Sequence, residues 1–158
     1  MIRTFIITII LLVGNISANA QTELWQKQLL QKVNEIRQKG CKCGRKNYPP
    51  VPKLTWNNKL EQSANNHAVD MYKNNYFQHN SRNGTNYSQR IEAAGYNWKF
   101  SGENIAEGQE NANDVFMDWL KSTSHCQNMM NKDFRNIGMA NCKTYWVQDF
   151  GTLFPIAK

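Results

Sequence analysis

The sequence predicts an α+β domain in which helices come first along the chain and strands come last. Apolar residues recur at intervals of three and four through the first two thirds of the chain, which is the spacing of amphipathic helices. Near the end, two apolar runs, 137–140 and 145–150, flank the short segment 141–144, as the strands of a β-hairpin do. Because helices and strands are segregated, we expect an antiparallel sheet covered by helices.

Composition is that of one folded domain. The 158 residues include 19 Lys and Arg against 12 Asp and Glu, and 41% are hydrophobic. These figures exclude a disordered chain, a collagen and a polytopic membrane protein. Lys and Arg are scattered, with no run longer than Arg45-Lys46. We therefore expect a diffuse surface charge and no nucleic-acid partner. The lack of a heptad repeat or an obvious association face predicts a monomer.

The first twenty residues are typical of a secretory signal. Residues 2–13 are almost wholly apolar behind Arg3, and Ala18-Asn19-Ala20 supplies the small residues of a signal-peptidase site. The apolar run is short for a membrane anchor, which is the alternative interpretation. We expect residues 1–20 to be removed, residues 21–158 to form a single domain without a membrane span, and the protein to be secreted or periplasmic.

Four helices are predicted ahead of the hairpin. The first begins at Thr22, which can cap it, and ends before Gly40. Residues 41–52 contain three prolines within four positions and are expected to form an ordered loop. The second helix is marked by an apolar stripe over residues 60–71. The third is predicted from Ser88 to Gly95, and the fourth from about 113 to 120.

Three histidines and one glutamate are the candidate reactive groups. His67 lies on the apolar stripe of the second helix and is interpreted as a hydrogen-bonded structural imidazole. His79 and His125 lie off the stripes, and neutral imidazoles with a carboxylate and water can bind zinc or copper. Glu103 is expected to be presented from a tight turn into a strand, either to act chemically or to hold that turn.

Ser122 and the cysteines offer alternatives. Ser122 stands three residues before His125 and could pair with it as nucleophile and base, but no Gly-x-Ser-x-Gly motif surrounds it, and a helix cap is the commoner role. The four cysteines, in an exported chain, predict two disulfides and no free thiol. Their connectivity is open, with Cys126–Cys142 favoured because these residues flank the turn into the hairpin and could close a longer loop. The cysteines are Cys41, Cys43, Cys126 and Cys142.

Several short stretches occur together in an order that matches a known family. They cover nearly all of the chain after residue 20 and include Gly102-Glu103-Asn104-Ile105-Ala106. The other stretches are 33–37, 52–57, 60–71, 77–79, 95–96, 119–125 and 145–151. In these motifs the chain resembles the CAP superfamily, or SCP domain, which includes cysteine-rich secretory proteins, venom allergens, plant pathogenesis-related proteins and bacterial secreted proteins.

The resemblance implies an α-β-α sandwich with an open cleft. In many members two histidines and two acidic residues line this cleft and can hold a divalent metal ion. Carried over by motif, the first three are His79, Glu103 and His125, while Ser122 stands where eukaryotic members have the second Glu. A serine there resembles the bacterial branch. Zinc or another divalent metal is the implied cofactor, with Glu107 or water completing its shell.

Three functions are consistent with this resemblance. The first is a secreted module that binds an extracellular ligand, protein or lipid at the cleft. The second is a metal-dependent hydrolase of extracellular or envelope material, with Glu103 as ligand or general base. The third is a lipid or sterol carrier that uses an aromatic surface. That surface would comprise Tyr72, Tyr76, Phe77, Trp98 and Phe100.

Overall fold

A computed structural model describes residues 18–155, with side chains from Leu24 onward. The helices are α1 (Ala18–Lys39), α2 (Asn58–Asn74), α3 (Tyr87–Ala93), α4 (Ala112–Lys121) and α5 (Thr123–Met129). The strands are β1 (Cys41–Cys43), β2 (Lys46–Tyr48), β3 (Thr55–Trp56), β4 (Trp98–Glu107), β5 (Asn136–Cys142) and β6 (Tyr145–Leu153). Most of the predicted signal segment lies outside the described residues, so cleavage after Ala20 stays a prediction.

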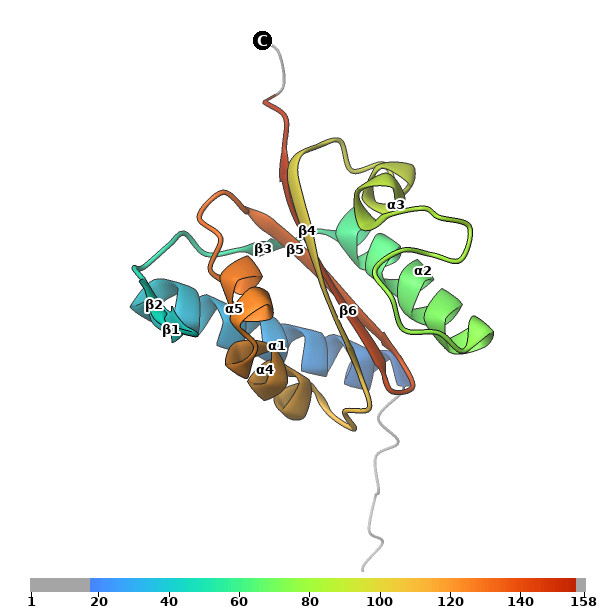
Figure 1. Ribbon diagram of the computed structural model, residues 1–158, viewed down its shortest axis with the longest axis horizontal. Helices are drawn as coiled ribbons and strands as arrows, with labels where there is room; N and C mark the ends of the chain where they lie inside the picture. The colour runs from blue at the N-terminus through green and yellow to red at the C-terminus, as the bar shows by residue number, and fades with distance from the viewer. Residues whose placement is uncertain (1–17, 156–158) are drawn as a thin grey trace, which may run out of the picture.

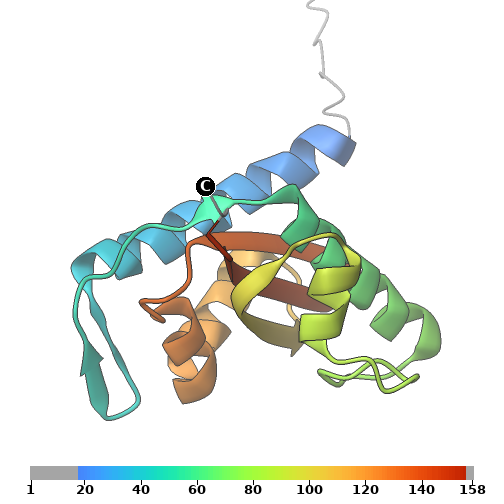
Figure 2. The same ribbon diagram turned by 90° about the horizontal axis from the view of Figure 1, so that it is seen from above.

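One four-stranded sheet forms the middle layer of the molecule. Its strand order is β3-β5-β6-β4, with β6 antiparallel to both neighbours and β3 parallel to β5. Helices α1, α4 and α5 lie on one face of the sheet, and α2 and α3 lie on the other (Figures 1 and 2). The α+β class, the hairpin and the α-β-α sandwich are therefore confirmed.

Strand β6 is central because both of its faces are covered. Tyr145 and Val147 belong to the apolar cluster beneath α2, whereas Trp146 and Phe150 belong to the larger cluster beneath α1 and α4. Successive side chains of a strand point to opposite faces, so burial of every residue from 145 to 151 requires a helical layer on each side.

Helix α2 rests directly on the sheet at Gly138 of β5. A Cβ at this position would lie 2.0 Å from the backbone nitrogen of Glu61 in α2, a distance that no side chain tolerates. The small residues Ala64 and Ala68 continue the contact along the helix, and both are fully buried. The buried polar residues Ser63 and His67 of α2 lie on the same side of the sheet as Glu103 and Asp149.

Three local predictions were wrong. Helix α1 begins at Ala18, four residues before the predicted cap at Thr22. Residues 41–48 form the hairpin β1–β2 rather than a loop, because the prolines begin only at 49 and Gly44 supplies the turn with a positive φ of 59°. Helix α3 begins at Tyr87, one residue earlier than predicted, because Asn86 caps it and forms a capping box with Gln89.

Arg37 fixes the end of α1 from inside the protein. Its side chain is fully buried, and its guanidinium donates to four backbone carbonyls, at distances of 2.7–3.3 Å. The acceptors are Pro52, Met129, Asn131 and Phe134. Burial lowers the pKa of Arg37 to about 10, which leaves it charged at neutral pH. One side chain thereby joins α1 to the loop before β3 and to the end of α5 with the segment that follows it.

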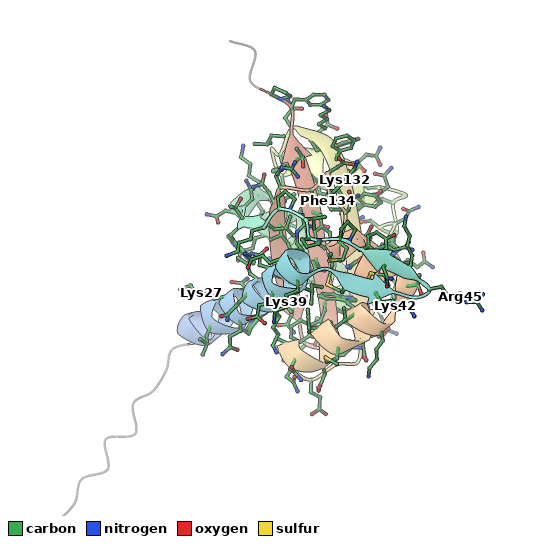
Figure 3. All side chains as sticks on the ribbon, turned by 90° about the vertical axis from the view of Figure 1, so that its left-hand side faces the viewer. Lys27, Lys39, Lys42, Arg45, Lys132 and Phe134 are labelled. Carbon is green, nitrogen blue, oxygen red and sulfur yellow. A yellow bond between two sulfur atoms is a disulfide. The ribbon has the colours of Figure 1, made fainter. Side chains whose placement is uncertain are left out.

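The basic surplus is local rather than diffuse, which corrects the expectation of evenly spread charge. Residues 21–56 contain eight Lys and Arg against two Glu, whereas residues 57–158 contain ten basic and ten acidic residues. Figure 3 shows the face on which Lys39 of α1 lies with Lys42 and Arg45 of the β1–β2 hairpin. Within residues 18–155, no helix combines the length and apolarity needed to cross a membrane.

Candidate functional site

Glu103 is at the centre of the candidate site, on the edge strand β4. Its side chain is 0% exposed, and each carboxylate oxygen has a partner: His79 Nδ1 lies 2.8 Å from Oε1, and Arg90 Nη2 lies 2.6 Å from Oε2. The prediction that Glu103 stands in a tight turn is wrong, because β4 is one continuous strand from Trp98 to Glu107. Glu103 is thus enclosed by the α2–α3 loop and α3.

The bond to Glu103 sets the tautomer of the His79 ring. An ionised carboxylate can only accept hydrogen bonds, so His79 Nδ1 donates and the neutral ring keeps its lone pair on Nε2. The His79 side chain is 51% exposed. The site therefore presents an oriented imidazole to solvent and keeps the carboxylate that orients it inside, the arrangement by which carboxylates support metal-binding histidines.

His125 reaches the same edge of the sheet from the opposite layer. It lies on α5, whereas His79 lies in the loop after α2 (Figure 1). Burial lowers the pKa of His125, and the nearby His79 lowers it further. The two predicted histidines thus approach the same strand, β4, from opposite layers of the sandwich.

A network of buried amides holds α5 against β4. Asn104 Nδ2 donates to Gln148 Oε1 at 2.9 Å and to the carbonyl of His125 at 3.2 Å. Asn128 of α5 donates to Asn104 Oδ1 at 2.9 Å and to the carbonyl of Glu103 at 3.1 Å. The position of His125 is therefore set by the residue next to Glu103.

Asp149 lies opposite Glu103 on the neighbouring strand β6 and is fully buried. Neither of its carboxyl oxygens has a hydrogen-bond partner in the structure, and the hydroxyl of Ser63 on α2 also lacks one. Burial raises the pKa of Asp149 well above its ordinary value, and the charge of Glu103 raises it further. The two carboxyls form a buried acidic pair in which Asp149 is the member that favours protonation.

His67 supports the site from α2, as the interpretation of a structural imidazole predicts. It is fully buried, and its Nε2 lies 2.9 Å from the carbonyl of Gln78, the residue before His79. Its Nδ1 has no hydrogen-bond partner, and burial lowers the pKa of the ring. His67 thus anchors the loop that carries His79.

A polar pocket of about 370 Å³ lies on the outer side of Arg90. Arg90 and His67 contribute to both the pocket and the surroundings of Glu103. The other lining residues are polar or charged: Asn66, Asp70, Asn74, Ser81, Arg82, Asn83 and Thr85. This lining is suited to a hydrogen-bonding ligand.

Ser122 does not pair with His125. It occupies the N-cap position of α5 but makes no side-chain cap bond, and its hydroxyl lies 3.4 Å from that of Ser124. Among residues 24–155, the only three metal-ligating side chains whose donor atoms gather within 4.8 Å of one another are Cys41, Cys43 and Cys126. The donor atoms of His79, Glu103 and His125 form no such group.

The cysteine predictions need correction. The structure has a disulfide between Cys43 and Cys126, not Cys126–Cys142, and Cys41 and Cys142 are free. Loop length alone favoured Cys126–Cys142, whereas in the structure the β1–β2 hairpin carries Cys43 onto α5. Cys142, at the end of β5, packs with the cluster on the α2 side of the sheet.

The aromatic residues predicted to bind lipid do not form one surface. Tyr72 stacks edge-on against Tyr145, which pairs with Glu107 at the end of β4. Trp98 and Phe100 lie at the opposite end of the same strand.

Comparison with known proteins places this chain in a family. Residues 30–150 match the model of the cysteine-rich secretory protein family, CAP. The chain belongs to the CAP family. The resemblance in the sequence motifs is therefore confirmed.

Individual CAP relatives are moderately similar. Two proteins of Bacillus subtilis are each 30% identical to this chain. The uncharacterized membrane protein YlbC matches over 125 residues, or 79% of this chain, and the uncharacterized protein YkwD matches over 136 residues, or 85%. The chain spans only 34% and 49% of their lengths. An outer surface protein of Borrelia burgdorferi, whose structure is solved, is 28% identical with a TM-score of 0.73, over 84% of this chain and 96% of that one.

Sequence reasoning missed Arg90 and Asp149. A signal for Asp149 existed, since it shares the alternating face of β6 with Tyr145 and Val147, where an acidic residue must be buried. Arg90 gave no such signal, because its pairing with Glu103 arises only when α3 packs beside β4.

Proposed function

We propose that this chain is an exported CAP-domain binding module that presents two imidazoles, those of His79 and His125, to a divalent metal ion or to a ligand. One observation carries the proposal: Glu103 is wholly enclosed, while His79, which it orients, is half exposed. A group that faces solvent in a fixed tautomer is suited to binding.

The same observation disfavours the hydrolase alternative. A general base must reach the proton that it removes, and Glu103 has both oxygens engaged and no exposed surface. We therefore assign Glu103 the role of orienting His79 instead of binding substrate or metal.

Zinc is the metal ion for which this donor set is best suited. His79 Nε2 and His125 would supply two nitrogen ligands, with water or a bound partner supplying the others. A bound zinc ion would act as a Lewis acid and organise an anionic or hydroxyl-bearing ligand beside the polar pocket. Burial favours the neutral form of His125, which is the form that binds metal.

Export is supported by independent features. The apolar segment 2–13 precedes a signal-peptidase pattern, and the Cys43–Cys126 disulfide suits an oxidising compartment. The Borrelia relative is named as an outer surface protein.

The test is a calorimetric titration of the protein with zinc at pH 7.5. We expect micromolar binding in the wild type and a loss of at least about tenfold in the His79→Ala/His125→Ala variant, since both ligands are removed. Cys142→Ser is the matched control, because it removes a free thiol that lies outside the cysteine group and should leave the zinc affinity unchanged. Zinc binding that survives the double histidine substitution, or no zinc binding by the wild type, would overturn the assignment of a metal site to His79 and His125.

A further inference from the structure

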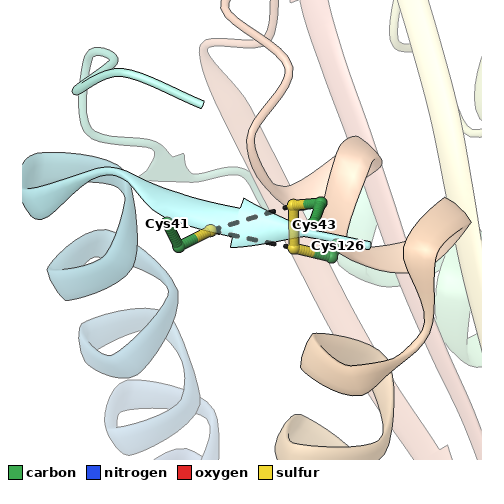
Figure 4. Close-up of side chains that lie close together, drawn as sticks. All are labelled: Cys41, Cys43 and Cys126. Atoms are coloured by element: carbon green, nitrogen blue, oxygen red, sulfur yellow. Dashed lines mark hydrogen bonds between the residues drawn. A yellow bond between two sulfur atoms is a disulfide. The ribbon is translucent and has the colours of Figure 1, made fainter. Parts of the chain in front are cut away.

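Three sulfur atoms meet where the β1–β2 hairpin contacts α5. Cys43 and Cys126 form the disulfide, and the free Cys41 Sγ lies 3.8 Å from Cys43 Sγ and 3.7 Å from Cys126 Sγ (Figure 4). Cys41 and Cys43 are two residues apart on β1, so their side chains lie on the same face of the strand. A thiol is thereby held beside a disulfide at two nearly equal distances.

From this arrangement we propose that Cys41, Cys43 and Cys126 form a thiol–disulfide exchange site with two alternative disulfides. The Cys41 thiolate attacks Cys126 Sγ, a new Cys41–Cys126 bond forms, and the Cys43–Cys126 bond breaks. The bonding electron pair leaves with Cys43 as a thiolate, which takes up the proton that Cys41 released. The exchange needs no external oxidant or reductant.

Cys126 is the favoured point of attack. Attack on Cys43 would produce a bridge between residues two apart on one strand, a small and strained ring. A Cys41–Cys126 bridge instead joins the same two elements as the present disulfide. Cys41 lies beside the existing S–S bond and not in line with it, so its side chain must rotate before attack. Cys41 is the least buried of the three cysteines.

The surroundings hold the present pairing as the resting state. Cys43 and Cys126 are fully buried, and burial raises the pKa of the Cys41 thiol, so that little of it is ionised near neutral pH. The turn of the hairpin also packs closely on α5, since a Cβ on Gly44 would lie 2.6 Å from Thr123 Oγ1. Exchange must move this turn relative to α5.

The exchange has a consequence for the histidine site that rests on the proposed function. Cys126 follows His125 directly on α5, so a change in the disulfide partner of Cys126 changes how the hairpin holds that part of the helix. We expect the two disulfide forms to differ in the placement of His125 and hence in zinc affinity.

The sequence provides a clear way to map the two forms. Lys42 stands between Cys41 and Cys43, so trypsin separates these cysteines into peptides 40–42 and 43–45, while Cys126 falls in peptide 122–132. The full chain is held at pH 8, quenched with acid, denatured and alkylated with N-ethylmaleimide before digestion. The exchanged form is identified by two products: peptide 43–45 with its cysteine alkylated, and peptide 40–42 joined by a disulfide to peptide 122–132.

We expect alkylated Cys43 in the wild type to exceed that in Cys41→Ser by at least about tenfold, because the variant has no thiol that can displace Cys43. Cys142→Ser is the matched control: it removes the other free thiol and should leave Cys43 labelling at the wild-type level. Equal Cys43 labelling in the wild type and Cys41→Ser would overturn the proposal.

A second variant tests the alternative bond itself. In Cys43→Ser, Cys41 and Cys126 should form a disulfide under air, and alkylation of both as free thiols in the purified variant would also overturn the proposal. These measurements read covalent bonds and use no zinc, so their outcome is independent of the zinc titration.

Discussion

Two neighbouring cross-strand pairs of β4 and β6 have opposite characters. On one face of the sheet, Asn104 and Gln148 hydrogen-bond each other and belong to a network that reaches α5. On the other face, Glu103 and Asp149 are two buried acids, of which Glu103 is paired with Arg90 and His79 and Asp149 has no hydrogen-bond partner. Both pairs are buried, so burial alone does not account for the difference.

The comparison separates a pair that stabilises the fold from one that costs stability. Amides that satisfy one another incur no large desolvation penalty, whereas a second buried carboxyl beside an ionised one is held at a net cost. The acid pair adjoins His79, the half-exposed residue of the candidate site. We infer that the fold bears this cost for the site and that substitution of the unpartnered Asp149 will differ in sign from substitution of Asn104.

The largest effect is expected for Glu103→Gln. It leaves Arg90, whose side chain is only 9% exposed, without its ion-pair partner, and breaking a buried pair in this way costs about 3–5 kcal/mol. Urea unfolding at pH 7 measures the loss. Glu107→Gln, an exposed residue of the same strand, is the matched control and should change the free energy of unfolding by less than about 0.5 kcal/mol. A similarly small change in Glu103→Gln would contradict the buried ion pair.

Asn104→Ala should destabilise the protein by about 2–4 kcal/mol, because it removes the bonds to Gln148, His125 and Asn128 and leaves buried partners unsatisfied. Urea unfolding again measures the change, with the exposed Asn113→Ala on α4 as control. If both variants unfold at the same urea concentration, the amide network does not stabilise the fold.

Asp149→Asn should have a smaller effect of opposite sign: it should increase the free energy of unfolding by about 1–3 kcal/mol at pH 8. The folded state raises the pKa of Asp149, so it binds the proton more tightly than the unfolded state does. This tighter proton binding contributes its full stabilisation below the ordinary carboxyl pKa. The stabilisation is lost as the pH rises through the pKa of Asp149 in the folded state. The variant lacks this titration, so its advantage should shrink as the pH is lowered toward 4.

Thermal unfolding at pH 4 to 8 measures the difference between Asp149→Asn and the wild type. Asp118→Asn, an exposed residue of α4, should change stability little at either end of this range. An Asp149→Asn protein that is less stable than the wild type at pH 8 would contradict the unfavourable burial of this carboxyl.

Periodicity was sufficient to predict most of the fold. The helical stripe over 60–71 became α2, and the two apolar runs became β5 and β6, since these patterns depend on which residues must be buried. The β1–β2 hairpin was missed because its strands have three residues each and carry little pattern.

The residues of the candidate site came from sequence motifs, whereas the contacts among them came only from the structure. The motifs placed His79, Glu103 and His125, and the structure brings His79 to Glu103 by a direct bond. Which groups enclose Glu103, and which sulfur pairs with Cys126, depends on how α3 and the hairpin pack against the sheet. Such contacts join residues far apart in the chain, where local spacing carries no information.

The buried guanidinium of Arg37 has a consequence for how the protein opens. It holds carbonyls from residue 52 and from residues 129–134, more than seventy positions apart, so neither segment can detach without leaving a buried charge unsolvated. In native-state hydrogen exchange, the C-terminal half of α1 and the segment after α5 should therefore exchange as one cooperative unit with a shared opening free energy.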